Sequence, residues 1–254
     1  MNHGSLFAGI GGFELAAQWM GWNNVFSVEI DPFCTTILQH HFPNSHKHGD
    51  ITTFDGTEFQ GKVDIITGGF PCQPFSKAGN QKGRGDERYL WPEMFRVIRE
   101  VGPRWVVAEN VRAFINDRGL AFDAVMSDLE SEGFEVFPCV LGAASVNAPH
   151  KRERVFLVAH VADGDGADLK RWNTHRTDEG MATEANRTQP PHRPTQWETF
   201  PRFRPVCGGD DGISAELDSM SFHQWRTKSV TAYGNAVCPP LVFELFKAIQ
   251  KSME

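Results

Sequence analysis

Cys72 is the first residue in the sequence whose type and setting suggest chemistry. It lies in the stretch Gly-Gly-Phe-Pro-Cys-Gln-Pro-Phe-Ser at residues 68–76, directly after an apolar run at 63–67 that predicts a buried parallel strand. Pro71 and Pro74 stiffen the turn that would present the sulfur. A cysteine thiolate is a strong nucleophile, although a free thiol with a pKa near ~8.5 is mostly protonated at neutral pH. Because free cysteine is also among the most buried residue types, this stretch alone leaves a structural thiol equally open.

Acidic side chains follow three further segments. Glu29 comes at the end of the apolar run 25–28, Glu109 follows the run 105–108, and Asp50 ends a short polar segment. The carboxyl ends of parallel strands border the ligand crevice of an open α/β sheet. We therefore expect these acids to face the same crevice as Cys72.

The N-terminal segment has the order strand, glycine turn, helix. Residues 4–8 form a short apolar strand candidate, and Gly9 and Gly11 precede a helix with apolar residues at helical spacing up to residue 20. Glu29 lies about twenty residues after the first glycine, which is the spacing at which an acid holds ribose hydroxyls in nucleotide-binding α/β folds. A glycine turn can also serve tight packing alone. The turn by itself therefore does not decide between a cofactor site and a packing role.

Alternation of strands and helices continues through residue 159, and basic side chains gather at two places. The polar segment 77–88 carries three glycines, and it predicts either a solvated surface loop or a lid that closes over a polyanion. The basic cluster 149–154 runs directly into the apolar strand 155–159. Such a cluster is either a surface feature or an anion contact at a strand end.

Composition limits the class of protein. With 254 residues, 40% hydrophobic and 22% charged, the chain is long enough for one α/β domain with an insertion. The net charge of −7 requires any nucleic-acid binding to use local basic patches. Its five cysteines are well separated in sequence, which argues against a disulfide framework and against a zinc cluster. Neither a secretion signal nor a membrane span is evident, so we expect a cytoplasmic protein.

The chain divides into three parts by composition. Residues 1–162 carry the periodic strands and helices, and residues 163–228 lose this periodicity while Gly, Pro, Thr, Asp and Arg accumulate. Residues 229–254 contain an expected turn around 232–240 and then a helix with apolar residues at helical spacing. We therefore predict an α/β domain, an irregular inserted segment, and a C-terminal helix that returns to the domain.

Several of these blocks together resemble the DNA cytosine-5 methyltransferases. The blocks occur in family order: Phe7-Ala8-Gly9-Ile10-Gly11-Gly12-Phe13, Glu29, Asp50-Ile51, Gly69-Phe70-Pro71-Cys72-Gln73, Glu109-Asn110-Val111, Lys151-Arg152-Glu153-Arg154 and Gly234-Asn235-Ala236-Val237. The resemblance covers roughly residues 4–160 and 230–250. It implies a Rossmann-like, S-adenosylmethionine-dependent methyltransferase fold, in which a mixed, mostly parallel sheet has helices on both faces and residues 163–228 form a short target-recognition segment.

The resemblance also implies roles for single residues at the target base. Cys72 would add to carbon 6 of a flipped-out cytosine, because carbon 5 is too electron-poor to take a methyl group directly. Glu109 would contact ring N3 and the exocyclic amine, Arg154 the base O2, and Arg152 either a phosphate or the scaffold of the site. Since the target lies inside the duplex stack, the base must be flipped out at a cost of a few kcal/mol.

The implied cofactor is S-adenosylmethionine, held at the other end of the crevice. Glu29 would hold the ribose hydroxyls and Asp50 the adenine amine. The other residues expected at the cofactor are Phe7, Gly9, Gly11, Ile30, Ile51, Pro71 and Asn235. Asn235 would bring the last helix back beside the first glycine motif.

The implied partner is double-stranded DNA, bound by a monomer without a metal or a membrane, and a cognate restriction endonuclease is a partner that the resemblance allows. The segment 163–228 is shorter than is typical of the family, and His150 replaces a commoner glutamine. Three other functions stay open: a relative that methylates transfer RNA, a non-catalytic module that keeps the fold, and, last, a nicotinamide-dependent oxidoreductase. The oxidoreductase reading leaves the Pro-Cys block unexplained.

Overall fold

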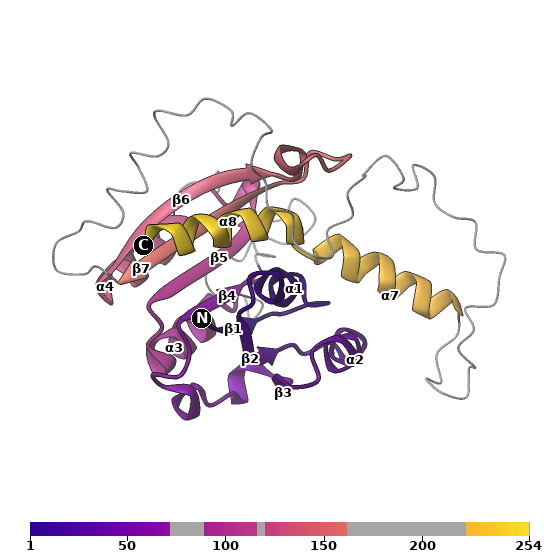
Figure 1. Cartoon of the computed structure of the whole chain (residues 1–254), viewed down its shortest axis with the longest axis horizontal. Helices are drawn as coiled ribbons and strands as arrows, with labels where there is room; N and C mark the ends of the chain where they lie inside the picture. The colour runs from indigo at the N-terminus through magenta and orange to yellow at the C-terminus, as the bar shows by residue number, and fades with distance from the viewer. Residues whose placement is uncertain (72–88, 116–119, 162–221, 254) are drawn as a thin grey trace.

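The structure is a computed structural model that describes residues 1–71, 89–115, 120–161 and 222–253 (Figure 1). The strands are β1 (Asn2–Leu6), β2 (Asn23–Val28), β3 (His46–His48), β4 (Ile65–Gly68), β5 (Trp105–Val111), β6 (Phe134–Gly142) and β7 (Glu153–Val161). The α-helices are α1 (Gly12–Trp19), α2 (Pro32–His41), α3 (Trp91–Val101), α4 (Leu120–Ser131), α7 (Phe222–Asn235) and α8 (Pro239–Ser252). Short 3-10 turns include η1 (Ile51–Thr53), η5 (Arg112–Phe114) and η6 (Ala143–Val146).

The strands form one seven-stranded sheet in the order β3-β2-β1-β4-β5-β7-β6. All neighbouring pairs are parallel except those of β7, which runs antiparallel to both β5 and β6. The expected mixed, mostly parallel sheet is thus confirmed. Strand order reverses between β1 and β4, and such a switch point is where an open α/β sheet leaves a crevice at the carboxyl ends of its strands.

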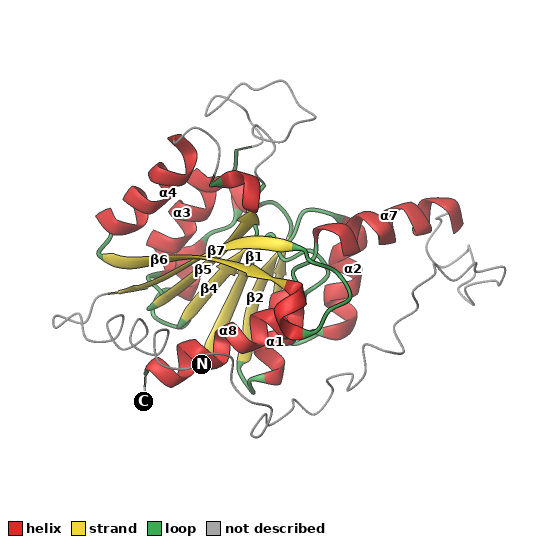
Figure 2. Ribbon diagram, turned by 90° about the horizontal axis from the view of Figure 1, so that it is seen from above, coloured by secondary structure: helices red, strands yellow, loops and turns green. Residues whose placement is uncertain are grey.

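Helices cover both faces of the sheet, as Figure 2 shows with α3 and α4 on one side and α1 and α8 on the other. Alternate residues of β5 enter the two cores, because side chains of a strand point to opposite faces in turn. Val106 and Ala108 pack with the helices α3 and α4, whereas Trp105 and Val107 pack with α1 and α8. Burial on both faces explains why this strand reads as a continuous apolar run.

Local signals in the sequence set several element ends. Asp31 accepts hydrogen bonds from the backbone N–H groups of Phe33 and Cys34, and Pro32 occupies the first turn, so α2 begins where expected. Helix α3 ends at Gly102, which has a φ of 64°. A left-handed residue at this position is favourable for glycine because it has no Cβ.

The C-terminal part differs from the expectation in one respect. Helix α7 runs from Phe222 to Asn235, across the boundary expected at residue 228 and through part of the turn expected around 232–240. The turn is confined to the residues between Asn235 and Pro239. Val230 and Tyr233 on α7 are 55% and 72% exposed, so this helix has no buried apolar stripe to reveal it in the sequence. The remainder of the inserted segment, residues 163–221, lies outside the described residues.

Candidate active site

A cavity of about 750 Å³ opens at the carboxyl ends of the strands, beside the switch point. This volume lies in the range of small-molecule and cofactor sites. Of the residues expected at the cofactor, the cavity is lined by Phe7, Gly9, Glu29, Ile30, Asp50, Ile51, Pro71 and Asn235. Glu109 and Arg154, expected at the target base, line the same cavity. The fold therefore brings most of the predicted site residues to one place.

The side chain of Glu29 is held by two backbone N–H groups. Its carboxylate accepts hydrogen bonds from the N–H of Gly9, at 2.7 Å, and from the N–H of Asp31, at 2.8 Å. One bond reaches each oxygen, and a carboxylate can accept about four hydrogen bonds in all. The free acceptor positions suit a pair of hydroxyl groups, as expected for a ribose.

Two glycines of the first turn have different roles. Gly9 has a φ of 57°, and a Cβ added to it would meet no atom of the described residues within 4 Å, so its backbone is open to the cavity. Gly11 has a φ of 88°, and an added Cβ would lie 2.5 Å from Cε2 of Phe42, the residue that directly follows α2. Gly11 is not among the described residues that line the cavity. It serves the close packing of α1 on α2, and its expected cofactor contact stays a prediction.

Asp50 lines the cavity together with the apolar residues Ile30 and Ile51. The N–H of Thr52 donates to Oδ1 of Asp50 at 2.9 Å, and hydrogen bonds from Thr52 lower the pKa of this carboxyl. Ile30 is 71% exposed in the wall of the cavity, whereas Ile51 is buried. An ionised carboxylate beside exposed apolar surface fits an aromatic ring that carries an amine donor.

Glu109 is a buried acid in the wall of the same cavity. Burial raises the pKa of this carboxyl to about 7, and the charges of Arg154 and Arg152 act against the increase. Arg154 Nε lies 3.0 Å from Glu109 Oε1, but no N–H of the described residues is aligned for a hydrogen bond to this oxygen. Glu109 can therefore carry a proton near neutral pH, and its Oε1 is buried against the guanidinium of Arg154.

The strand pairing explains how Arg154 reaches Glu109. Strand β7 pairs antiparallel with β5 so that Arg154 lies opposite Val111, two residues beyond Glu109. Arg152 precedes β7 and is not among the described residues that line the cavity. Its guanidinium instead donates to the backbone carbonyls of Gly234 and Ala236. Of the two alternatives for Arg152, this geometry favours the scaffold over a phosphate contact.

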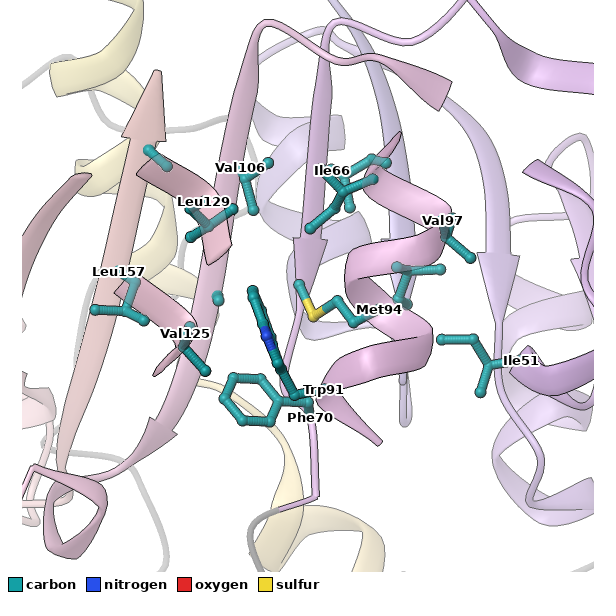
Figure 3. Close-up of a cluster of buried hydrophobic side chains, with 14 of the residues drawn as sticks. Ile51, Ile66, Phe70, Trp91, Met94, Val97, Val106, Val125, Leu129 and Leu157 are labelled. Carbon is teal, nitrogen blue, oxygen red and sulfur yellow. The ribbon is translucent and has the colours of Figure 1, made fainter. Parts of the chain in front are cut away.

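Cys72 itself lies outside the described residues, but the chain that leads to it is firmly held. The ring of Phe70 is 3% exposed and packs on Trp91, with ring centroids 5.3 Å apart (Figure 3). It also packs on Phe114, with ring centroids 5.4 Å apart. The side chain of Asn110 donates to the carbonyl of Phe70 at 3.1 Å. Pro71, the residue immediately before the cysteine, lines the same cavity as Glu109.

Asn110 is a residue to which the sequence assigned no role. Its amide oxygen accepts from the N–H of Val111 at 2.8 Å while its amine holds Phe70, and the residue is only 5% exposed. Its place directly after Glu109 at a strand end was the available signal. Thr227, Lys228 and Thr231 of α7 also line the cavity, although the sequence placed the first two in the recognition segment.

The C-terminal helix α8 lies beside the first glycine motif. A Cβ added to Gly12 would lie 2.7 Å from Cγ2 of Val237, so only glycine allows this contact. Helix α8 packs on α1 in the same core cluster. Asn235 is thereby placed in the wall of the cavity that Glu29 also lines, although the two residues are far apart in the sequence.

Two classes of feature are missing from the described part of the chain. No group of three or more His, Cys, Asp or Glu side chains there could hold a metal ion. Among the same residues, no helix is both long and apolar enough to cross a membrane.

Comparison with known proteins gives the family. The sequence matches the family of C-5 cytosine-specific DNA methylases over residues 1–199. It is 40% identical over 162 residues to the type II methyltransferase M.PspPI of Psychrobacter, covering 62% of this chain and 39% of that protein. It is 38% identical over 170 residues to the type II methyltransferase M.Eco47II of Escherichia coli, covering 65% of this chain and 41% of that protein.

A solved structure agrees with these matches. A DNA modification methyltransferase encoded within a prophage of E. coli superposes with a TM-score of 0.55 at 26% identity, covering 63% of this chain and 47% of that one. The chain spans about two fifths of the length of the two type II relatives. The family match over residues 1–199 contains the seven strands of the sheet and the glycine turn. The chain belongs to the family of C-5 cytosine-specific DNA methylases.

Proposed function

We propose that the protein transfers a methyl group from S-adenosylmethionine to carbon 5 of a flipped-out cytosine in double-stranded DNA, through a covalent adduct with Cys72. The observation that carries this proposal is the single cavity that joins Glu29, Asp50 and Asn235 to Glu109, Arg154 and Pro71. One group of side chains suits a nucleoside, and the other suits a neutral heterocyclic base. A shared cavity permits direct transfer between the two.

The residues present fit the cofactor. Glu29 offers free acceptor positions for the ribose hydroxyls, Gly9 leaves its backbone open to the cavity, and Asp50 offers a carboxylate for an amine. Phe7 and Ile30 supply apolar surface for the adenine ring. When bound, S-adenosylmethionine supplies a methyl group activated by its sulfonium centre.

The protein's own residues prepare the acceptor. The Cys72 thiolate forms a bond to carbon 6 of cytosine, and the displaced electron pair is taken up at N3 with a proton held by Glu109. This converts the ring into an enamine whose carbon 5 can take the methyl group. Loss of the carbon 5 proton to a base then breaks the bond between sulfur and carbon 6 and restores the aromatic ring. Burial suits Glu109 to this role, because its pKa of about 7 keeps a proton available.

DNA that contains 5-fluorocytosine tests the mechanism, because fluorine at carbon 5 blocks the final elimination. We expect a protein–DNA adduct that survives denaturation when S-adenosylmethionine is present. Cys72→Ala should abolish both the adduct and methylation of ordinary DNA, while calorimetry shows unchanged cofactor binding. Glu109→Gln should slow adduct formation without removing the attachment point.

Cys34 provides a matched control, because it lines the same cavity. Burial, together with the nearby Glu29 and Asp31, raises the pKa of this thiol to about 12, so it stays protonated at neutral pH. Cys34→Ala should keep the adduct. An adduct that maps to another cysteine, or methylation by Cys72→Ala, would refute the assignment. Absence of any adduct with DNA, with the cofactor bound normally, would instead support an RNA substrate or a non-catalytic module.

A further inference from the structure

Arg152 makes a long-range contact that the proposed mechanism does not use. Its Nη1 donates to the carbonyl of Gly234 at 2.9 Å, and its Nη2 donates to the carbonyl of Ala236 at 2.5 Å. The two acceptors lie 82 and 84 residues further along the chain. The planar fork of a guanidinium can satisfy two carbonyls at once, which the single ammonium of a lysine does less well.

One acceptor carbonyl, that of Gly234, lies in the last turn of a helix, and the other, that of Ala236, directly follows the helix. Helix α7 ends at Asn235, and the last carbonyls of an α-helix have no partner within the helix. A cation at this end also interacts favourably with the helix dipole. Arg152 therefore caps α7, which projects from the body of the protein before the chain turns into α8 (Figure 1).

Asn235 stands between the two capped residues and lines the cavity. On the other side of the same segment, Val237 packs on Gly12, where no Cβ would fit. The segment 234–237 is thus held at one end by Arg152 and at the other by the first turn of α1. Arg152 and Gly12 are not among the described residues that line the cavity, but together these two contacts set the position of Asn235.

The backbone of Arg152 is itself in an uncommon conformation. Its φ is 30°, a region that side chains other than glycine rarely adopt. Such a conformation persists only where surrounding contacts hold it, and it is commoner at functional sites than elsewhere. The two hydrogen bonds to the 234–236 segment are contacts of this kind.

We propose that Arg152 is a positioning residue that holds the 234–237 segment, and with it Asn235, against the cofactor end of the cavity. The inference rests on the proposed function for the identity of the ligand. It assigns Arg152 to the cofactor end, whereas its neighbour Arg154, two residues along the chain, acts at Glu109. Two arginines of one basic cluster thereby hold different parts of the site, Arg154 by its ion pair with Glu109 and Arg152 by its hydrogen bonds to the 234–236 segment.

Hydrogen exchange of the protein without any ligand tests the contact itself. Arg152→Ala should speed amide exchange at residues 234–237 about tenfold or more, and Arg152→Lys should have a smaller effect because it keeps the charge but loses the fork. Lys151→Gln is the matched control, since it removes a neighbouring exposed charge. In this variant, amide exchange at residues 234–237 should be unchanged. Unchanged exchange at 234–237 in folded Arg152→Ala would overturn the proposal.

Calorimetry with S-adenosylmethionine, without DNA, tests the consequence. We expect Arg152→Ala to weaken cofactor affinity about tenfold, a loss comparable to that of one or two hydrogen bonds. In an Asn235→Ala background the same change should have little further effect, because both act on one contact. If the two losses simply add, Arg152 does not act through Asn235.

The competing phosphate role gives a different result. In that case Arg152→Ala would leave cofactor affinity unchanged, weaken DNA binding, and reduce its salt dependence by the value of about one contact. If Arg152→Ala fails to fold, Arg152→Lys carries the same comparison. Failure of the wild-type protein to bind S-adenosylmethionine would refute the proposed function, whereas the exchange result would still decide the role of Arg152.

Discussion

Glu29 and Glu109 are the same residue type at the ends of two parallel strands, yet their surroundings differ. Glu29 is partly exposed and accepts two backbone hydrogen bonds, one at each oxygen. Glu109 is 7% exposed, has an oxygen without a hydrogen-bond partner in the described residues, and has its pKa raised by burial to about 7. The first environment holds a carboxylate in a fixed orientation. The second keeps a carboxyl group able to gain and lose a proton.

This difference assigns binding and chemistry to different residues of one cavity. A preorganised carboxylate gains affinity by meeting hydroxyl groups without rearrangement. A desolvated carboxyl with a pKa near the working pH is suited to proton transfer. Variants of the two glutamates should therefore separate affinity from rate.

The largest effect is expected for Glu109→Gln on the rate of methyl transfer. Glutamine keeps the shape but cannot supply a proton to N3, and removing such a group costs about a thousandfold in kcat. Single-turnover methylation of DNA would measure the rate, and calorimetry should show unchanged affinity for S-adenosylmethionine. If Glu109→Gln lost affinity for S-adenosylmethionine and kept its methyl-transfer rate, Glu109 would be a cofactor-binding residue, and the contrast with Glu29 would be wrong.

A pH titration of stability should show the burial of Glu109. A carboxyl whose pKa is raised from 4.5 to about 7 keeps its proton in the folded protein over a range in which the unfolded chain has lost it. Its contribution is fully present below pH 4.5 and is lost as the pH rises through about 7. At 1.36 kcal/mol for each pH unit, the loss is about 3 kcal/mol.

Urea denaturation from pH 4.5 to pH 8 should therefore show a weaker pH dependence for Glu109→Gln than for the wild type. Glu14 is a matched control, because burial raises its pKa to about 7 as well, and it lies on α1 rather than in the cavity wall. Glu14→Gln should also weaken the pH dependence of stability, but only Glu109→Gln should change the pH profile of activity. Identical pH dependence in the wild type and in Glu109→Gln would contradict a raised pKa.

The third effect concerns the two glycines of the first turn. Both have positive φ, so alanine at either position is strained, but only at Gly11 would the new Cβ lie 2.5 Å from Phe42. Gly11→Ala should therefore lose about 2 kcal/mol more stability than Gly9→Ala, since overpacking typically costs 1–3 kcal/mol. Thermal denaturation of the pair measures this difference. Equal losses would mean that α2 moves away without cost.

The sequence predicted the arrangement of these groups wherever local patterns were sufficient. Apolar runs indicated the strands other than β3, which is polar, and Asp31 as N-cap with Pro32 at the first helical position located α2. The alternation of strands and helices placed Glu29 and Glu109 at the carboxyl ends of strands in one sheet. Each of these signals lies within a few residues of the feature that it predicts. Their agreement made the fold predictable before any contact was known.

The rest depends on contacts between distant parts of the chain. Helix α7 does not bury an apolar stripe, since Val230 and Tyr233 on it are exposed, and its sequence therefore lacks the helical periodicity of a packed helix. Composition alone placed its first half in the inserted segment. The packing role of Gly11 appears only once Phe42 is seen beside it. Arg152 reaches carbonyls more than 80 residues away, a contact that no local pattern encodes.

The smallest effect is expected for Glu29→Ala, which should weaken S-adenosylmethionine binding about tenfold, or about 1.4 kcal/mol, with the fold intact. The side chain gives up its contact to the ribose and also leaves the N–H groups of Gly9 and Asp31 without their acceptor, but both N–H groups border the cavity, where water can replace it. Calorimetry on the folded variant measures the affinity, and single-turnover methylation at saturating cofactor should match the wild-type rate. Glu29→Gln should fall between, because an amide retains one acceptor oxygen. A lower methylation rate at saturating cofactor would show that Glu29 also takes part in chemistry. Unchanged affinity would contradict the assignment of Glu29 to the ribose hydroxyls.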